Sequence, residues 1–573
     1  MIHLRIGPLV RATSTTSAVI WAKLSHACNI TLNAIPYDAS EDEKATSTVS
    51  VSMRTVTVGG HHYAAPQLQG LQPGTWYRYY LSTSSIAADH VDKAESIEQS
   101  FLQCFRTMNA SISEASQEKT PPPSEAFSLR LAYGSCRKYI MPETDALSAF
   151  GRWLRNHLDE RETMWPHLLL LIGDQIYADQ PLDEFVQMHP HLHDGAVTFE
   201  DFALIYEYIW TSDTDVRQVF AVMPTYMIFD DHDVINNWNI SPQWRASMLQ
   251  HGQEQVLVDG LIAYWVYQGW GNLVSREQTD HPLLTIMQEA EQSGEDALER
   301  LRTYIKREVY RKSDGHWHYT IPTTPPIFVV NARTERTTVF TDYPDDIYGP
   351  TRIMSQSQMA ELEEWMQRHD TSLSLLVSSV PVLLPPLIGL AEYLMGIRLW
   401  QPGLRWLGLR LAHIQQRFAL RISFDHWPVY SQTWHELIHS LTRRTHDVLV
   451  LSGDVHFSYA MEAHRSFFKN TKARLIQFVS TPLQNALGRK SEQMIVGQAS
   501  ITRSIYGGLH TRMLPLYEAN EKRRLQHDIL LRNTLAYVTL QPDDKNDYIV
   551  EQEYLGVVDG QMQVVGRTKL SYR

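Results

Sequence analysis

Cysteine is scarce in this sequence. The 573 residues include three cysteines, Cys28, Cys104 and Cys136, too few for a disulfide framework and consistent with a reducing compartment. The first residues, Met1 to Pro8, contain neither an apolar signal segment nor a twin arginine. The sequence as printed therefore predicts a cytoplasmic protein.

Positive charge is also in deficit, because 51 lysine and arginine residues stand against 64 aspartate and glutamate residues, for a formal net charge of −13. Nucleic-acid surfaces rely on lysine and arginine to neutralise phosphates, so this balance argues against a general nucleic-acid surface. An acidic protein can still bind phosphate at a local site where metal ions supply the positive charge.

Long apolar runs are the third feature in short supply. Residues 382–418 are apolar enough to raise the question of a membrane segment, but charged residues and prolines interrupt any span of about 20 residues. The interrupting residues are Glu392, Arg398, Arg405, Arg410, Pro385, Pro386 and Pro402. We expect no transmembrane helix. The segment fits buried helices of an insertion, and it also fits a mobile lid or a helix in peripheral contact with a membrane.

The first 108 residues alternate between polar and apolar side chains in short runs separated by polar turns, as β-strands do. Residues 70–81 resemble the turn and following strand of fibronectin type III and related immunoglobulin-like sandwiches, and residues 105–107 resemble the last strand. Residues 109–126 are rich in Ser, Glu and Pro and predict a linker. The sequence thus predicts a β-sandwich domain over 1–108 and a catalytic domain over 127–573.

Four apolar runs in the second domain predict strands that end in residues able to bind metals. The runs are 129–133, 168–172, 226–229 and 448–451. The residues that follow them are Gly134-Ser135-Cys136, Gly173-Asp174-Gln175-Ile176-Tyr177, Asp230-Asp231-His232-Asp233 with Asn236-Asn237-Trp238, and Ser452-Gly453-Asp454-Val455-His456. Polar groups just past the carboxyl ends of buried strands lie where open α/β sheets carry their chemistry. Singly, Cys136 fits an inert core thiol and Tyr177 a packing residue, but together the groups provide the ligand count of a two-metal centre.

Other segments complete an α/β pattern. Thr144 is expected to cap a helix that leads back to the strand before Asp174, which makes a β-α-β unit. The chain between 238 and 310 is expected to be helical. Residues 536–573 alternate again and are expected to add antiparallel strands to the sheet.

In order and approximate spacing, the four motifs resemble those of the PhoD-type alkaline phosphatases, which belong to the calcineurin-like metallophosphoesterase superfamily. The resemblance covers nearly the whole chain, because these proteins also carry an N-terminal sandwich domain. It implies an α/β fold, a layered sandwich of two packed mixed β-sheets flanked by helices. Two departures are visible. Asn331-Ala332-Arg333 stands where the family has Asp-x-Arg, and Asp425-His426-Trp427-Pro428-Val429-Tyr430 only loosely matches Asp-x-Trp-x-Gly-Tyr.

The resemblance also implies which residues hold metals. Cys136, Asp174 and Tyr177 would bind one ion, with Asp174 bridging to a second. The centre would be completed by Asp231, one of Asn236 and Asn237, Asp454 and His456. The family is associated with Fe3+ and Ca2+, and relatives use other ions such as Mn2+, Zn2+, Co2+ or Mg2+. A phenolate and a thiolate suit a trivalent or borderline metal, whereas Asp and Asn oxygens suit a hard cation.

The implied function is hydrolysis of a phosphomonoester or phosphodiester, in which a metal-bound hydroxide attacks phosphorus. His232 would act as general acid or orient the phosphate, and Asp174 is the other expected catalytic residue. Arg137, His232 and Arg333 are the expected substrate-binding residues. The expected partner is a small phosphoester or a phospholipid, and the motifs say nothing about the oligomeric state.

Two other interpretations stay open. A purple-acid-phosphatase-like hydrolase would also pair a sandwich domain with a tyrosine-ligated iron, but Cys136 in the first motif argues against it. A non-enzymatic binding scaffold would be favoured by the loss of a ligand, and the sequence has lost none.

Overall fold

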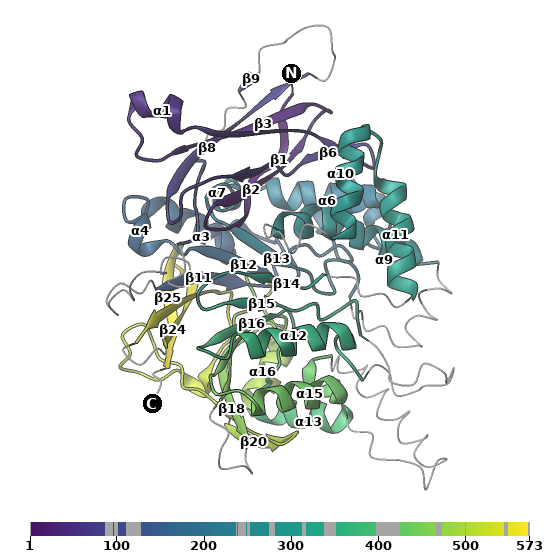
Figure 1. Cartoon of the computed structure of the whole chain (residues 1–573). Coiled ribbons are helices and arrows are strands. Elements are labelled where there is room, and N and C mark those ends of the chain that lie inside the picture. Colours follow the sequence, from purple (N-terminus) through teal and green to yellow (C-terminus); the bar gives the residue numbers. More distant parts are fainter. Residues whose placement is uncertain are drawn as a thin grey trace.

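A computed structural model describes most of the chain. It covers residues 2–85, 95–96, 101–109, 128–236, 238, 248, 252–273, 281–311, 317–336, 351–396, 425–465, 473–498, 500–543 and 548–570. In Figure 1 the N-terminal strands, in purple, lie at one end of the molecule, and the C-terminal strands, in yellow, run along one side.

The N-terminal part is a β-sandwich. Its first sheet contains β1 (Leu4–Thr13), β2 (Ser17–Leu24), β5 (Val56–Val58), β6 (His61–Ala64) and β7 (Gln67–Gln69). Its second sheet contains β3 (Asn29–Pro36), β4 (Val49–Arg54), β8 (Trp76–Ser84), β9 (Glu95–Ser96) and β10 (Cys104–Arg106), and a short helix, α1 (Glu41–Ser47), joins β3 to β4. Buried residues from both sheets, such as Ile20, Leu32 and Phe105, form one apolar core. The predicted β-sandwich is confirmed, and its fibronectin III or immunoglobulin type stays a prediction.

The sandwich packs firmly against the rest of the protein. Leu9 and Trp21 of its first sheet belong to the main apolar core of the catalytic part. Arg11 is fully buried and donates to Asn272 Oδ1 at 2.9 Å and to the Gln268 carbonyl. The predicted linker falls, apart from residue 109, outside the described residues, so the domain boundaries stay a prediction.

The first central sheet has the order β13-β12-β11-β23-β24-β25. Its strands are β11 (Leu129–Gly134), β12 (Leu168–Ile172), β13 (Thr225–Ile228), β23 (Leu535–Pro542), β24 (Tyr548–Val558) and β25 (Gln561–Leu570). β11, β12 and β13 run parallel, and every residue of β12 and β13 is buried. The last three strands add in antiparallel fashion, as the alternating C-terminal sequence predicts.

Helices connect and cover these strands. They are α3 (Ala146–Asn156), α4 (Arg161–Met164), α5 (Asp183–Met188), α6 (Phe199–Thr211), α7 (Thr214–Val222), α9 (Glu254–Tyr264), α10 (Pro282–Ser293) and α11 (Leu298–Arg311). A π-helical segment, η4 (Trp265–Gly269), continues α9. The predicted cap of α3 is wrong, because Thr144 belongs to a preceding 3-10 turn and Asp145 accepts from the backbone N–H of Leu147 at 2.9 Å. The helical character expected between 238 and 310 is confirmed for the described residues.

The second central sheet packs against the first. Its strands are β14 (Tyr319–Ile321), β15 (Ile327–Val329), β16 (Ser374–Ser378), β17 (Val448–Ser452), β18 (Ser458–Arg465), β19 (Leu475–Val479), β20 (Arg503–Tyr506), β21 (Leu509–Met513) and β22 (Ile529–Leu530). Leu170 of one sheet and Val377 and Leu451 of the other share the main core. Four further helices accompany this sheet, namely α12 (Gln356–Arg368), α13 (Pro386–Gly396), α15 (Ser431–Thr442) and α16 (Arg489–Gln498). The predicted layered α/β fold is confirmed.

The apolar segment 382–418 is described only in part. Residues 386–396 form α13, and residues 397–424 lie outside the described part, so the lid and the membrane contact stay predictions. Among the described residues, the helices are too short or too polar to traverse a bilayer.

Candidate metal centre

The loops that follow the four strands meet between the two sheets. The Asp454 N–H donates to Ser135 Oγ at 3.1 Å, so the loops after β17 and β11 touch. The contact needs glycine at position 453, where an added Cβ would lie 2.1 Å from Ser135 Oγ. Gly173, with φ at 108°, lets the loop after β12 approach Asp230, because an added Cβ would lie 2.7 Å from the Asp230 Cβ. The fold therefore brings the loops of the four motifs together.

Backbone conformation marks the same loops. Cys136, Asp174, Asp454 and His456 all have positive φ, at 58°, 55°, 69° and 60°. Such angles are uncommon outside glycine and tend to cluster at functional sites. Four predicted ligands therefore share a strained backbone that the surrounding fold maintains.

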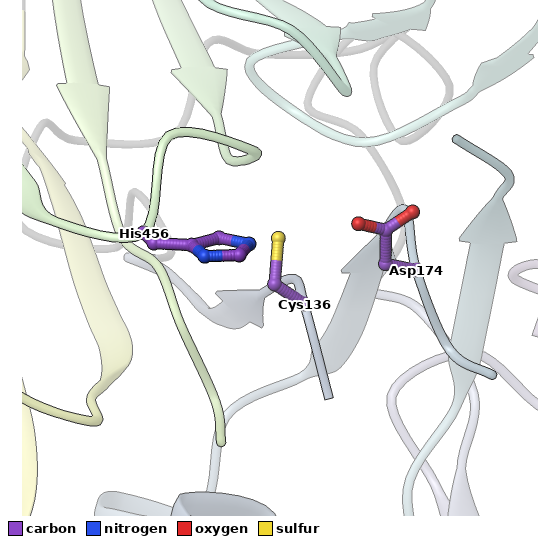
Figure 2. A group of neighbouring side chains, drawn as sticks. All are labelled: Cys136, Asp174 and His456. Atoms are coloured by element: carbon purple, nitrogen blue, oxygen red, sulfur yellow. The ribbon is translucent and has the colours of Figure 1, made fainter. Parts of the chain in front are cut away.

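Acidic, thiol and imidazole groups converge on Asp174. Ligand atoms lie within 4.8 Å of one another in three sets: Cys136 with Asp174 and His456, Asp174 with Asp231 and His232, and Asp174 with Asp230, Asp231 and Asp454. Figure 2 shows the Cys136 sulfur between the His456 ring and the Asp174 carboxylate. Asp174 belongs to all three sets, as expected of a residue that bridges two ions.

Tyr177 lies at the edge of this cluster. Its hydroxyl is 3.5 Å from Asp174 Oδ2, and its ring lies 4.4 Å from the His232 ring, measured between centroids. Asn485 donates from Nδ2 to Tyr177 Oη at 2.8 Å and lies 3.4 Å from His456 Nε2. Sequence reasoning missed Asn485, although it follows the buried strand β19 and the strand-end rule could have found it.

His232 is held by a carboxylate that the sequence reading did not assign. Its Nδ1 lies 2.8 Å from Asp179 Oδ1, and its backbone N–H donates to Asp174 Oδ1 at 3.2 Å. Burial lowers the pKa of His232, but the hydrogen bond to Asp179 and the charge of Asp231 outweigh it, so the pKa is raised overall. The ring is therefore set up to hold a proton, with Nε2 as its other nitrogen.

Asp233 joins the loops after β12 and β13 by accepting hydrogen bonds from their backbone. Its carboxylate accepts from the backbone N–H groups of Asp174, at 2.8 Å, and of Gln175, Ile176 and Asp230. Gln268 of η4 also donates to it at 3.1 Å. Sequence reasoning placed Asp233 in a motif without a role, because a spacing cannot show which amides a buried carboxylate collects.

Of the two asparagines predicted as alternative ligands, only Asn236 is described. Its backbone N–H donates to Asp179 Oδ2 at 3.3 Å. Asn237 falls outside the described residues. Their role as ligands stays a prediction.

Both predicted substrate-binding arginines have internal partners. Arg137 is buried and pairs with Asp145, with Nε at 2.8 Å from Oδ2. Arg333 is buried between Asp230 and Asp425. Asn331, where the family has aspartate, accepts from the Arg333 N–H at 3.2 Å. Carboxylates other than residue 331 thus orient the Arg333 guanidinium, and a substrate role for either arginine stays a prediction.

Burial and the concentration of acidic groups shift the pKa values of this cluster. Burial, reinforced by Asp231, raises the pKa of Asp174 far above its usual range, and burial raises that of Asp230 to about 7. Burial also raises the pKa of Cys136 and Tyr177, with neighbouring acids adding to the effect. Burial lowers the pKa of His456 to about 4, so its imidazole is neutral, as a metal ligand must be. Buried acids in such number have to be neutralised by protons or by a cation, and the thiol, imidazole and oxygen donors of the cluster fit metal ions.

A family comparison agrees with this geometry. Residues 131–507 match the family described as PhoD-like phosphatase. The chain belongs to the PhoD-like phosphatase family. Membership, together with the acidic clusters, indicates a metal-dependent phosphoesterase. Residues 1–90 match a domain of unknown function, DUF7800. No curated protein matches the chain.

A solved structure shows the same fold. "Structure of PhoD" matches with a TM-score of 0.59 and 15% identity, covering 100% of this chain and 92% of that chain. A sensor domain of the anti-sigma factor RsgI4 in Pseudobacteroides cellulosolvens matches 21% of this chain and 100% of its own, at 18% identity and a TM-score of 0.14, which is too low to bear on fold or function.

Proposed function

We propose that this PhoD-like protein hydrolyses phosphoesters at a two-metal centre built around Asp174. The supporting observation is that Asp174 is a member of all three sets of candidate ligands. Two cations held there would neutralise the charge of a phosphate and activate a water molecule for attack on phosphorus. Cys136, Tyr177, His456 and Asp174 would hold one cation.

The second cation would be held by oxygen ligands. Asp174, Asp231 and Asp454 offer carboxylates within one cluster, and Asn236 or Asn237 would add an amide oxygen. Thiolate and phenolate ligands favour Fe3+ in the first position, and the oxygen-rich second position favours Ca2+, with Mn2+, Zn2+, Co2+ and Mg2+ as alternatives.

His232 would donate the proton that the leaving oxygen needs. Its Nδ1 is bound to Asp179 at 2.8 Å, which leaves Nε2 to face the ester. Asp179 would hold the ring in place and favour the protonated form. Arg333, fixed by Asp230 and Asp425, would add positive charge behind the phosphate.

The test is hydrolysis of a panel of phosphoesters by metal-loaded protein. The panel contains an alkyl and an aryl phosphomonoester, an aryl phosphodiester and a phospholipid dispersed in detergent. The proposal expects turnover of at least one class and its loss after chelation, with recovery when metal is returned. A metal-loaded protein that hydrolyses none of them, or whose hydrolysis survives complete removal of metal, would contradict it.

A further inference from the structure

A buried glutamate from the apolar insertion reaches toward the metal centre. Glu392 lies on α13 and is 0% exposed, and its Oε1 is 2.6 Å from His426 Nδ1. Removing a carboxylate from water is costly unless it is paired, so this contact has to balance the cost. A glutamate in an otherwise apolar helix is thus positioned for one partner.

His426 also contacts a predicted metal ligand, Asp454. Its Nε2 lies 3.0 Å from Asp454 Oδ2, so the imidazole bridges two carboxylates that are 62 positions apart in the sequence. His426 is only 9% exposed and does not belong to the three sets of close ligand atoms found among the described residues. Its place is therefore behind Asp454 and outside the ligand cluster.

The neighbouring residue supports the centre from another side. Asp425 pairs with Arg333, and Arg333 pairs with Asp230 of the loop after β13. Residues 425 and 426 thus hold two different loops of the centre. This is the segment that only loosely matches the family pattern.

Helix α13 packs closely against neighbouring segments of the chain. An added Cβ at Gly396 would lie 2.3 Å from the Val429 carbonyl oxygen, and one at Gly389 would lie 2.6 Å from Tyr506 Oη. Both glycines allow the helix to lie directly on its neighbours, which fixes where Glu392 can reach. Helix α13 is therefore linked to Asp454 through the side chains of Glu392 and His426.

We propose that Glu392 and His426 form a positioning pair that fixes the carboxylate of Asp454 for metal binding, and so make metal retention depend on helix α13. The inference rests on the proposed metal centre. A hydrogen bond to one carboxylate oxygen fixes the rotation of the group and leaves the other oxygen available to a cation. Outer partners of metal ligands contribute about 10- to 100-fold in metal affinity.

The experiment measures how firmly each protein holds its metals. Metal-loaded wild type and the variants Glu392→Gln, His426→Asn and His426→Gln are dialysed against graded EDTA, and the metal left per chain is measured by mass spectrometry. The matched control is His435→Asn, because His435 is exposed and contacts Tyr393 of α13 at 3.3 Å. Unfolding temperatures are measured with and without metal.

The EDTA concentration that removes half of the bound metal should be about 10- to 100-fold lower for Glu392→Gln and His426→Asn than for wild type. His426→Gln should fall between them and wild type, because its amide can still donate near the position of Nε2. His435→Asn should behave as wild type. The two positioning variants should lose more thermal stability in the metal-loaded form than in the metal-free form, where only the broken buried contact counts.

Two outcomes would overturn the inference. One is metal retention in Glu392→Gln and His426→Asn equal to wild type. The other is an equal loss of stability in metal-free and metal-loaded protein, which would assign the pair to folding alone. A wild type that binds no metal would instead refute the proposed function on which the inference rests.

Discussion

Asp179 Oδ1 lies 2.8 Å from Nδ1 of His232, and the rings of His232 and Tyr177 lie 4.4 Å apart between centroids. The histidine is thus fixed on one side by a carboxylate and on one face by a predicted metal ligand. A ring held in this way can deliver a proton along one direction, which is what a general acid requires.

Asp179→Asn is expected to slow hydrolysis selectively. Asparagine keeps the size of the side chain but removes the charge that raises the pKa of His232. Turnover of an alkyl phosphate should fall by up to about 10²-fold, and turnover of an aryl phosphate with a good leaving group should fall much less. His232→Ala should show the same pattern with a larger loss. Equal losses on both substrates would show that the pair binds phosphate or supports metal instead.

Iron beside Tyr177 would colour the protein. A phenolate or thiolate bound to Fe3+ transfers charge to the metal and absorbs visible light, which Zn2+ and Ca2+ cannot produce. Tyr177→Phe should shift or weaken the band without unfolding the protein, and Cys136→Ser separates the thiolate contribution. A fully metallated, active protein without iron and without a visible band would contradict the ferric assignment.

Asp233→Ala should destabilise the protein, although Asp233 is not among the candidate metal ligands. The change leaves the buried N–H groups of Asp174, Gln175, Ile176 and Asp230 without their acceptor. We expect a loss of about 3 kcal/mol or more in the free energy of unfolding, measured by urea denaturation. The control Asp159→Ala, at an exposed position, should change stability by less than about 0.5 kcal/mol. If both variants matched wild type, Asp233 would have no organising role.

The metal-depleted protein should lose stability as pH rises above 6.5. Burial raises the pKa of Asp174, and raises that of Asp230 to about 7. Burial lowers the pKa of His232 and His426, but their carboxylate partners outweigh it and raise both. Above pH 6.5 all four groups therefore hold more protons in the folded state than in the unfolded state, so the free energy of unfolding falls with pH. His456, whose pKa is lowered to about 4, acts in the opposite direction, but its contribution ends within about one pH unit above 6.5, where the unfolded imidazole has also lost its proton.

Urea denaturation at pH 6.5 and 8.5 measures this effect. Chelator-treated protein should be less stable at pH 8.5, and metal-loaded protein should show a smaller drop, because a cation takes the place of the protons. A metal-depleted protein that gains stability across the interval would contradict the electrostatic description of the centre.

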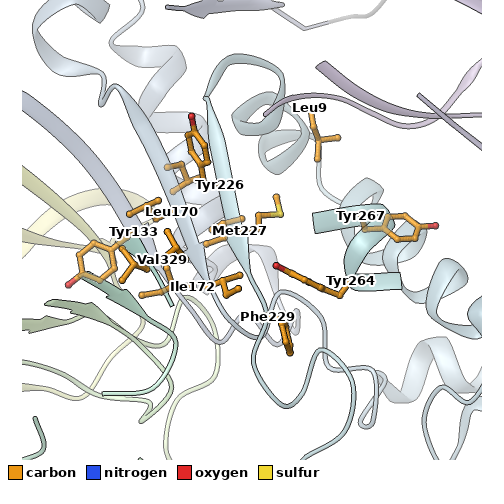
Figure 3. Packing of buried hydrophobic residues seen from close by; sticks show 14 of the residues in the cluster. Leu9, Tyr133, Leu170, Ile172, Tyr226, Met227, Phe229, Tyr264, Tyr267 and Val329 are labelled. Carbon is orange, nitrogen blue, oxygen red and sulfur yellow. The ribbon is translucent and has the colours of Figure 1, made fainter. Parts of the chain in front are cut away.

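The sheets could be predicted because strong local patterns carry them. The apolar run 168–172 coincides with β12, and Figure 3 shows Leu170 and Ile172 within the main apolar packing near Tyr133 and Val329. A run buried on both faces has no polar side chains, and its short length and the glycine that follows it favour a strand. The candidate metal-binding motifs could be predicted for the same reason, since each follows such a run.

The supporting residues could not be predicted in this way. Asp179 and Glu392 are single polar residues whose partners lie far away in the sequence, and no periodicity marks them. The cap of α3 shows the same limit on a local scale. Thr144 and Asp145 are both good capping residues, and the choice between them depends on the 3-10 turn that precedes the helix.

Metal content of wild type and Asp174→Asn tests the central claim most directly. Both proteins are loaded with metal, freed of excess ions and analysed by mass spectrometry, with circular dichroism to confirm folding and an aryl phosphate to measure turnover. We predict about two metal ions per chain in wild type, and a loss of bound metal together with hydrolysis in folded Asp174→Asn. A variant that keeps its metals and near wild-type turnover would contradict a centre built around Asp174.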